Sequence, residues 1–349
     1  MKLWVGKHPG CDTSTIQAAV DLAERQPVDR TAIIYIHPGV YEEMVRIDRS
    51  NLALIGLGEV VIRMNRHATE LNEAGEEIGT FATPTLFLGG SRLVLEHLTI
   101  ENTAGPGEQA GQALAVYAHC DLAVFRHCRL IGQQDTLFTG PLPPYPLTRP
   151  AFGGFPLREH HQQYRQLYDQ CRIEGNIDFI FGGATAYFED CEIHSLARMN
   201  PLSPGYITAA STAPEQAAGY VFSRCRLSAE PEVGKGSVFL GRPWREHAAT
   251  SFVNCELGEH IHRQGWDPWD DSGREKTVRY GEYGLGTRAI ELRVSRVPWA
   301  ACCEHGEEAW SRQEVFGEAE EHFFYRILRL SEGGWEFEND NSEPDFARL

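Results

Sequence analysis

A six-residue pattern that recurs along the chain constrains the fold more than any other feature of the sequence. Each copy has an aromatic residue, two further residues, a cysteine, a charged residue, and then leucine or isoleucine. The aromatic, cysteine and aliphatic positions fall at i, i+3 and i+5, which is not helical spacing and indicates a half-buried strand. The copies are FRHCRL at 125–130, YDQCRI at 168–173, FEDCEI at 188–193, FSRCRL at 222–227 and FVNCEL at 252–257.

The distances between these copies predict a solenoid. Successive cysteines of the pattern are 43, 20, 34 and 30 residues apart, which is the length of one or two coils with extra residues looped out on one side. Equivalent side chains would then stack between coils about 4.8 Å apart. A chain of 349 residues could form two average domains, but one solenoid also reaches this length, and 42% hydrophobic residues suffice for its core.

Composition and charge exclude several classes of protein. No stretch approaches the roughly 18 apolar residues of a membrane span, and a formal charge of −17 argues against nucleic-acid binding. The first residues, MKLWVGKHPGCD, contain no apolar signal region. We therefore expect a cytoplasmic protein, or a secreted one if a leader has been removed. We also expect a monomer with no nucleic-acid or membrane partner.

The nine cysteines predict a reduced ladder inside the solenoid. Their number is odd and their placement is regular, which favours buried thiols that pack as small apolar groups over a disulfide framework. The sequence has no CxxC spacing and no paired histidines on a helix. We assign no metal and no cofactor.

The two ends of the chain predict different secondary structure from its middle. Residues 14–24 predict an amphipathic helix that caps the open end of the solenoid, with Thr13 or Ser14 as N-cap. Residues 33–256 read as short strands. After Gly265 we expect a C-terminal packing segment that includes a helix near 306–318. The apolar side of the capping helix would carry Ile16, Val20, Leu22 and Ala23.

We predict one domain over residues 1–335. A proline-dense rim insertion at about 139–165 lies between two candidate catalytic aspartates, and such a loop is a candidate wall for a substrate cleft. Residues 336–349 are acidic and polar, and they predict a disordered tail.

Three motifs carry groups suited to hydrolysis. GQQDTLF at 132–138 contains Asp135, DFIFG begins at Asp178, and LGRPW at 240–244 contains Arg242. A pair of carboxyl groups can catalyse hydrolysis, because one group attacks the substrate or activates a water while the other donates a proton to the leaving group. Taken alone, each residue also has a structural alternative. Asp135 could cap a turn, Gln112 could satisfy a coil backbone, and Arg242 could form a structural ion pair.

The order of these motifs resembles the pectin methylesterase (pectinesterase) family over roughly residues 1–300. The same order includes TIQAAVDLA at 15–23, IIYIHPGVYEE at 33–43, NLALIGLG at 51–58, LTIENTAG at 98–105, GQALAV at 111–116 and DFIFGGATAYFEDCEI at 178–193. The resemblance implies an all-β fold, a right-handed parallel β-helix with an N-terminal capping helix and a C-terminal packing segment. It also implies hydrolysis of methyl esters on galacturonate, in pectin or oligogalacturonides, with release of methanol.

The resemblance also implies roles for named residues. Asp178 is the nucleophile, Asp135 the acid and then the base, Gln112 and Gln134 the oxyanion donors, and Arg242 the partner that orients Asp178. A guanidinium would keep Asp178 ionised, while a neighbouring carboxylate and poor solvation would raise the pKa of Asp135 above its ordinary value of about 3.9. Aromatic rings near these groups suit the C–H faces of sugars, and Trp244, Phe181 and Phe138 are the candidate substrate contacts. Phe138 and Phe181 could instead fill the solenoid core, so Trp244 is the strongest of the three.

Some features depart from the family pattern, and other functions stay open. Gln133 stands where a tyrosine is expected, and the segment between Asp135 and Asp178 is longer than in plant members. A thioesterase or other acyl hydrolase could use the same groups, and a non-catalytic solenoid could bind polysaccharide. A polysaccharide lyase with this fold would require a Ca²⁺-binding carboxylate cluster. A glycosidase would require a pair of acids but not the glutamine donors.

Overall fold

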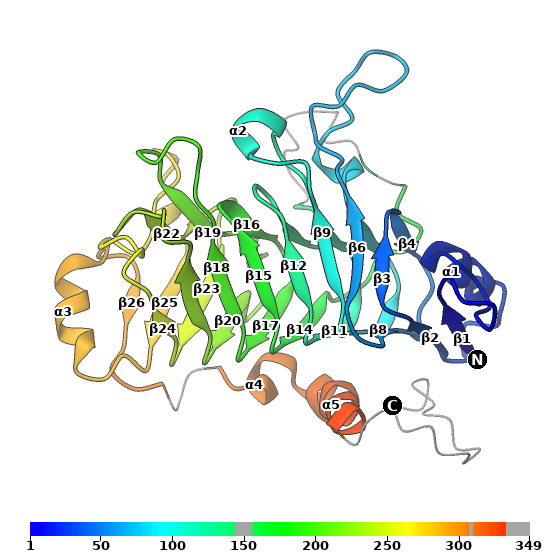
Figure 1. Ribbon diagram of the computed structural model, residues 1–349. Coiled ribbons are helices and arrows are strands. Elements are labelled where there is room, and N and C mark those ends of the chain that lie inside the picture. Colours follow the sequence, from blue (N-terminus) through cyan, green and yellow to red (C-terminus); the bar gives the residue numbers. More distant parts are fainter. Residues whose placement is uncertain (144–153, 155, 307–309, 333–349) are drawn as a thin grey trace.

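The computed structural model describes residues 1–143, 154, 156–306 and 310–332. In it the chain winds around one core, and its successive coils form three parallel sheets (Figure 1). In these residues sheet A has 11 strands, sheet B has 8 and sheet C has 7. The chain passes from sheet A to sheet B to sheet C in each coil, and each strand pairs in parallel with the equivalent strand of the next coil. This arrangement is a parallel β-helix, as the recurring pattern predicts.

The strands of sheet A are β1 (Lys2–Val5), β2 (Ala32–Ile36), β5 (Leu52–Gly56), β8 (Ser91–Glu96), β11 (Asp121–Arg126), β14 (Arg165–Asp169), β17 (Thr185–Glu189), β20 (Tyr220–Ser223), β23 (Ala249–Val253), β25 (Arg279–Tyr283) and β26 (Ala301–Cys302). Those of sheet B are β3 (Gly39–Tyr41), β6 (Val60–Met64), β9 (Thr99–Asn102), β12 (Arg129–Ile131), β15 (Arg172–Gly175), β18 (Glu192–Ser195), β21 (Arg226–Ala229) and β24 (Glu256–Leu257). Those of sheet C are β4 (Val45–Ile47), β7 (Leu86–Leu88), β10 (Val116–Ala118), β13 (Leu137–Thr139), β16 (Ile177–Gly182), β19 (Gly205–Ala210) and β22 (Val238–Pro243).

Each copy of the recurring pattern turns the corner from sheet A to sheet B. The residue before the cysteine has a left-handed backbone in every copy, with φ between 50° and 53°. This conformation costs a non-glycine residue about 1–2 kcal/mol. It also redirects the chain from one sheet to the next within a single residue. These residues are His127, Gln170, Asp190, Arg224 and Asn254.

The aromatic residues of the pattern form a stacked column inside the solenoid. Strand register pairs each ring with the ring of the next coil. Ring centroids along the column lie 4.7, 4.6, 4.4 and 4.5 Å apart, with interplanar angles of 13° or less. The predicted stacking between coils is therefore confirmed. The rings are Phe125, Tyr168, Phe188, Phe222 and Phe252.

The cysteines of the pattern form a second column. Each thiol after the first donates to the carbonyl oxygen of the aromatic residue one coil earlier, as Cys171 does to Phe125 at 3.3 Å and Cys225 to Phe188 at 3.3 Å. All nine cysteines lie in the described residues and all are free. The predicted column of cysteines is confirmed, its reduced state stays a prediction, and burial raises the thiol pKa of Cys171 and Cys225.

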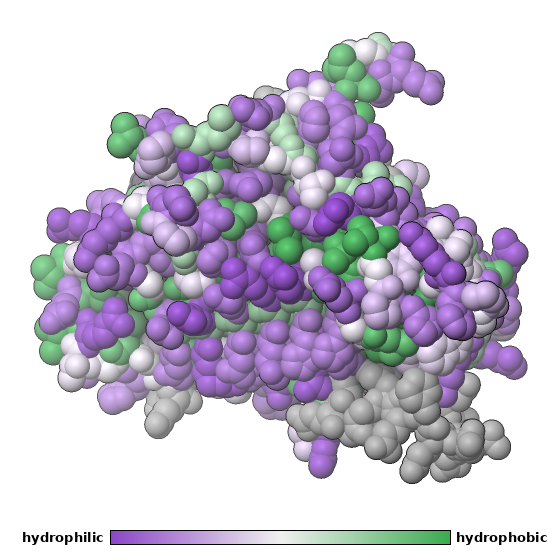
Figure 2. All heavy atoms as spheres, viewed as in Figure 1, coloured by the Kyte–Doolittle hydropathy of each residue, from purple (hydrophilic) through white to green (hydrophobic). Residues whose placement is uncertain are grey.

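The charged residue of the pattern explains the polar face of sheet B. It follows the cysteine directly, and in the strand register it aligns with its counterpart in the next coil. Arg172 donates to Glu174 at 2.7 Å and also pairs with Glu192 one coil on. Figure 2, drawn from the same side as Figure 1, shows a largely hydrophilic surface over these strands.

Helix α1 (Ile16–Glu24) covers the N-terminal end of the solenoid, as expected, but it starts later than predicted. Its N-cap is Thr15, whose hydroxyl accepts from the Ala18 amide at 3.3 Å, and not Thr13 or Ser14. The Glu43 carboxylate accepts from the first two helical amides, those of Ile16 and Gln17, at 2.8 and 2.9 Å. A side chain distant in sequence therefore fixes where the helix begins.

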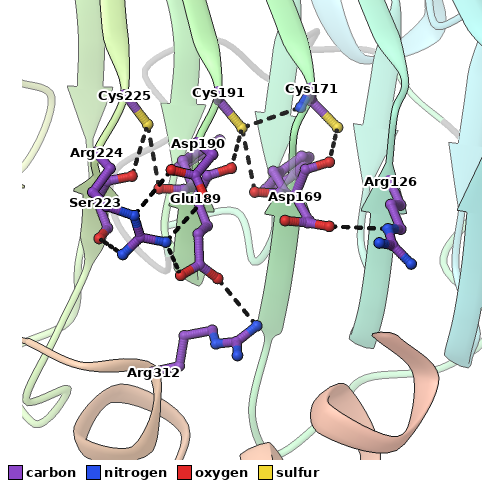
Figure 3. A network of polar contacts seen from close by, with 12 residues as sticks. Arg126, Asp169, Cys171, Glu189, Asp190, Cys191, Ser223, Arg224, Cys225 and Arg312 are labelled. Atoms are coloured by element: carbon purple, nitrogen blue, oxygen red, sulfur yellow. Dashed lines mark hydrogen bonds and ion pairs between the residues drawn. The ribbon is translucent and has the colours of Figure 1, made fainter. Parts of the chain in front are cut away.

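The C-terminal segment packs on the solenoid, as expected, and its last part, residues 312–332, covers the outer face of sheet A. Rings and aliphatic groups including Phe323, Phe324 and Ile327 pack on that face. Charged residues surround this contact in Figure 3, where Arg312 pairs with Glu189 at 3.0 Å. The helix predicted at 306–318 is shorter, because α4 begins only after its N-cap Ser311 and ends at Gly317, which has φ 56°. The segment contains α3 (Arg288–Ser295), β26, α4 (Arg312–Phe316), the π-helix η3 (Glu320–Phe324) and α5 (Tyr325–Glu332).

Some predicted features fall outside the described residues. These are the acidic tail at 336–349 and the middle part of the rim insertion, namely 144–153 and 155. The single domain over 1–335 stays a prediction. Within the described part of the chain, no helix is both long and apolar enough to span a membrane, and no group of three or more His, Cys, Asp or Glu side chains is placed to hold a metal ion.

Candidate active site

Asp135 and Asp178 occupy equivalent corners of successive coils, where sheet B turns into sheet C. Gln134 pairs with Ile177 one coil on, and the Asp135 amide donates to the Ile177 carbonyl at 3.0 Å. Both aspartates have a left-handed backbone, with φ 65° and 46°, a costly conformation that often marks functional sites. The register between β16 and β19 shifts between Ile177 and Ile180, the stretch that contains Asp178, and such irregularities re-aim side chains.

Arg242 reaches Asp178 from β22, two coils further along sheet C. Its Nε donates to Oδ1 at 2.9 Å and its Nη2 to Oδ2 at 2.6 Å, which is the bidentate geometry of a strong ion pair. The guanidinium lies between two rings, 3.9 Å from the centroid of Tyr206 and 4.0 Å from that of Trp269. These contacts leave Arg242 little freedom to turn away from Asp178.

A cleft of about 220 Å³ opens over these groups. It brings together both carboxylates, Arg242 and the two predicted amides, Gln112 and Gln134. Gln134 directly precedes Asp135 at the corner, and Gln112 follows the short helix α2 (Gly107–Ala110). The remaining lining residues are Thr80, Phe81, Phe181, Ala209, Trp244 and Trp269.

The two carboxyl groups differ in their surroundings. Burial, together with the charge of Asp178, raises the pKa of Asp135 well above its ordinary range. Burial also raises the pKa of Asp178, but the bidentate bond and the charge of Arg242 oppose that shift. Asp178 is therefore the carboxylate more easily kept ionised, and Asp135 the one more easily kept protonated.

The predicted aromatic contacts divide into two groups. Phe181 and Trp244 line the cleft, with ring centroids 5.7 Å apart in a T-shaped contact. Phe138 is fully buried and does not line the cleft, because the rings of Phe81 and Phe181 cover it at centroid distances of 4.8 and 5.1 Å. The structure therefore places Phe138 beneath the cleft, where it supports the other rings.

Sequence reasoning missed three aromatic residues around the cleft. Phe81 belongs to the 3₁₀ turn η1 (Thr80–Ala82) in a long connection between β6 and β7. Trp269 and Tyr206 hold Arg242 between them. The cluster GWDPWDD at 265–271 was a usable signal for Trp269, since indole rings in an irregular segment often serve a site.

The described ends of the rim insertion lie close to these rings. Leu142 and Leu157 pack against the aromatic cluster that contains Phe81 and Phe138. The backbone of Gly154 also approaches Phe81, since a Cβ on Gly154 would lie 3.1 Å from the Phe81 Cβ. The role of the insertion as a cleft wall stays a prediction.

Fold and site together define a right-handed parallel β-helix with a carboxylate pair and an arginine in an open cleft. Carrot pectin methylesterase has the same fold, with a TM-score of 0.71 and 26% identity, and the match covers 96% of each chain. Pectin methylesterase PemA from Erwinia chrysanthemi has a TM-score of 0.71 and 25% identity, over 90% of this chain and 97% of that one.

Sequence comparison agrees. The Pectinesterase family model matches residues 2–142 and 152–315. Pectinesterase QRT1 from Arabidopsis thaliana is 34% identical over 304 residues, which cover 85% of this chain and 72% of the relative. The probable pectinesterase/pectinesterase inhibitor 64 from the same plant is 36% identical over 310 residues, and this chain spans 46% of its length. The chain belongs to the pectinesterase family of carboxylic ester hydrolases.

The comparisons correct one prediction. The expected cytoplasmic location is wrong, because the plant relatives are cell-wall or secreted pectinesterases and point to an extracellular location. The prediction depended on the absence of an apolar segment at the start of the sequence, which is weaker information than family membership. The expected monomeric state stays a prediction.

Proposed function

We propose that the protein hydrolyses the methyl esters of methylated galacturonate residues in pectin-type chains and releases methanol. The observation that carries this proposal is the pair of coil-equivalent carboxylates, of which only Asp178 holds a bidentate arginine. A pectin methylesterase of the same fold, with 25% identity and a TM-score of 0.72, has been solved with a hexasaccharide. This likeness supports a sugar chain as the ligand of the cleft.

The proposed reaction begins with Asp178. One carboxylate oxygen attacks the carbonyl carbon of the ester, and the electron pair of the C=O bond moves onto its oxygen. The amide groups of Gln112 and Gln134, which line the cleft beside the acids, donate to this oxyanion. Arg242 keeps Asp178 ionised and oriented before the attack.

Asp135 manages the protons. As the tetrahedral intermediate collapses, its carboxyl proton passes to the departing methoxy oxygen, and methanol leaves. An anhydride between Asp178 and the substrate remains. The Asp135 carboxylate then takes a proton from a water that attacks the anhydride, so that the galacturonate acid is released and both aspartates return to their first state. Trp244 and Phe181 offer ring faces to the sugar.

The test is methanol release from methyl-esterified galacturonan and from methylated oligogalacturonides. Asp178→Asn and Asp135→Asn should each lower turnover by roughly 10³-fold or more while the fold stays intact. The exposed Asp271→Asn serves as the control and should change nothing. Wild-type turnover in either cleft variant would overturn the roles. Hydrolysis of thioesters but not of methyl esters would favour a thioesterase, and sugar binding without hydrolysis a non-catalytic solenoid.

A further inference from the structure

Two short corners between sheets B and C lie at the site, and a long corner flanks them on each side. The corner that contains Asp135 is short, at 132–136, and the corner that leads into β16, where Asp178 lies, is the single residue 176. The corners on either side are long, 103–115 before β10 and 196–204 before β19. The first of these long corners contains α2, which projects from the solenoid in Figure 1.

An ion pair joins the two long corners across the short ones. Arg198 Nε donates to Oε1 of Glu108 on α2 at 3.0 Å, although 90 residues separate them. The Arg198 Nη1 donates to the Pro204 carbonyl at 2.6 Å, which fixes the guanidinium on its own loop. The two side chains are only 17% and 23% exposed, so this pair is less screened by solvent than a surface pair.

Helix α2 packs against Gln134 and is joined to Gln112 through Gly111. A Cβ on Gly107 would lie 2.4 Å from Oε1 of Gln134, so the helix backbone rests directly on that side chain. The helix ends at Gly111, which has φ 76°, and Gln112 follows it at once. The Ala113 amide then donates to the Gln134 carbonyl at 3.1 Å. The position of α2 therefore constrains both Gln112 and Gln134.

We propose that Glu108 and Arg198 are positioning residues, whose ion pair ties α2 to the corner at 196–204 and holds Gln112 and Gln134 in place over the two aspartates. The roles of the glutamines in this inference rest on the function proposed above. Arg198 also lies close enough to Asp178 for its charge to favour the ionised carboxylate. The pair thus acts on the site through both geometry and charge.

Hydrogen exchange on the intact protein directly tests whether the Glu108–Arg198 ion pair holds α2 in place. The amides of Gln109, Ala110 and Gly111 are bonded to carbonyls of Pro106 and Gly107, and they report whether α2 is held. Exchange should be faster in Arg198→Gln and in Glu108→Gln, and should return toward the wild-type rate in the swapped double variant E108R/R198E. The control is Arg226→Gln, which removes an exposed ion pair on sheet B. Wild-type exchange in Arg198→Gln would overturn the proposal.

Kinetics test the consequence for the site. Both single variants should lower kcat roughly 10- to 100-fold with KM within about threefold, since displaced oxyanion donors act mainly on the transition state. Gly107→Ala should lower kcat in the same way with the ion pair intact, because its Cβ would displace Gln134. Faster exchange with unchanged kcat would also refute the proposal.

The pH profile separates the electrostatic effect of the Arg198 charge on Asp178 from the structural effect of the Glu108–Arg198 ion pair. Arg198→Gln should move the acidic limb of kcat/KM to higher pH, whereas Glu108→Gln keeps the cation and should not. The other titratable groups around Asp178 are Asp135, Arg242, Asp267, Tyr206 and Tyr280, and all are unchanged in both variants. A wild type that releases no methanol would defeat the proposed function, while the exchange result would still decide whether the pair holds α2.

Discussion

Asp135 and Asp178 lie one coil apart at the same corner of the solenoid, and both have a left-handed backbone. Cys128 and Cys171 lie one coil apart as well, at the corner between sheets A and B. The same 43 residues separate the members of each pair. The rim insertion lengthens this coil between β13 and β14 without disturbing either corner. The coil repeat, and not a dedicated loop, therefore sets the positions of the two carboxyl groups.

The different surroundings of these carboxyl groups predict a bell-shaped pH dependence of kcat/KM. Activity should fall on the acidic side as Asp178 is protonated. It should fall on the alkaline side as Asp135 loses its proton, at a pH well above the ordinary carboxyl range because burial and the charge of Asp178 raise that pKa. Initial rates on a fully methylated oligomer across acidic and alkaline pH would show both limbs, which belong to the coupled pair. A rate that keeps rising into alkaline pH would contradict the assignment.

Arg242→Lys should lower kcat even though the charge is kept. Lysine cannot bond to both oxygens of Asp178, and it cannot stack flat between Tyr206 and Trp269 as the guanidinium does. We expect a loss of roughly 10- to 1000-fold in kcat, together with a movement of the acidic limb to higher pH. The exposed Arg263→Lys is the matched control, and equal rates in the two variants would refute this account of Arg242.

Phe188→Ala should strongly destabilise the solenoid without altering the site. Phe188 is fully buried and stacks on Tyr168 at 4.6 Å and on Phe222 at 4.4 Å. Its loss leaves a cavity in the middle of the column, and we expect a cost of about 3–5 kcal/mol in the free energy of unfolding. Urea denaturation would measure it, with Leu202→Ala, at a 92% exposed residue, as control. A loss below that of the control would argue against the column as a source of stability.

The repeating parts of the fold were predictable because their information is local. The aromatic, the cysteine and the charged residue each recur at one place in the coil, so one strand's pattern predicts the next. The cap of α1 was not predictable, because Glu43 reaches it from a different element. Phe138 and Phe181 are equivalent in successive coils, and sequence alone could not show that Phe81 would cover one ring more closely than the other. Such contacts depend on long connections between strands, and the sequences of these connections do not repeat from coil to coil.

Asp169 should make the stability of the protein depend on pH between about 4 and 6. Burial under the C-terminal helices raises its pKa to about 6, despite the ion pair with Arg126 at 3.1 Å (Figure 3). The native state therefore binds a proton more tightly than the unfolded chain. This carboxyl contributes stability that is greatest below its ordinary pKa of 3.8 and is lost as pH rises to about 6.

Asp169→Asn removes that titration. The difference in unfolding free energy between wild type and variant should change by roughly 2 kcal/mol between pH 4 and 7 and stay constant above that, after allowance for solvent screening. Chemical denaturation at a series of pH values would measure it, and Asp271→Asn should run parallel to the wild type throughout. A difference that does not vary with pH would show that Asp169 keeps an ordinary pKa. It would also show that Arg126 compensates fully for its burial.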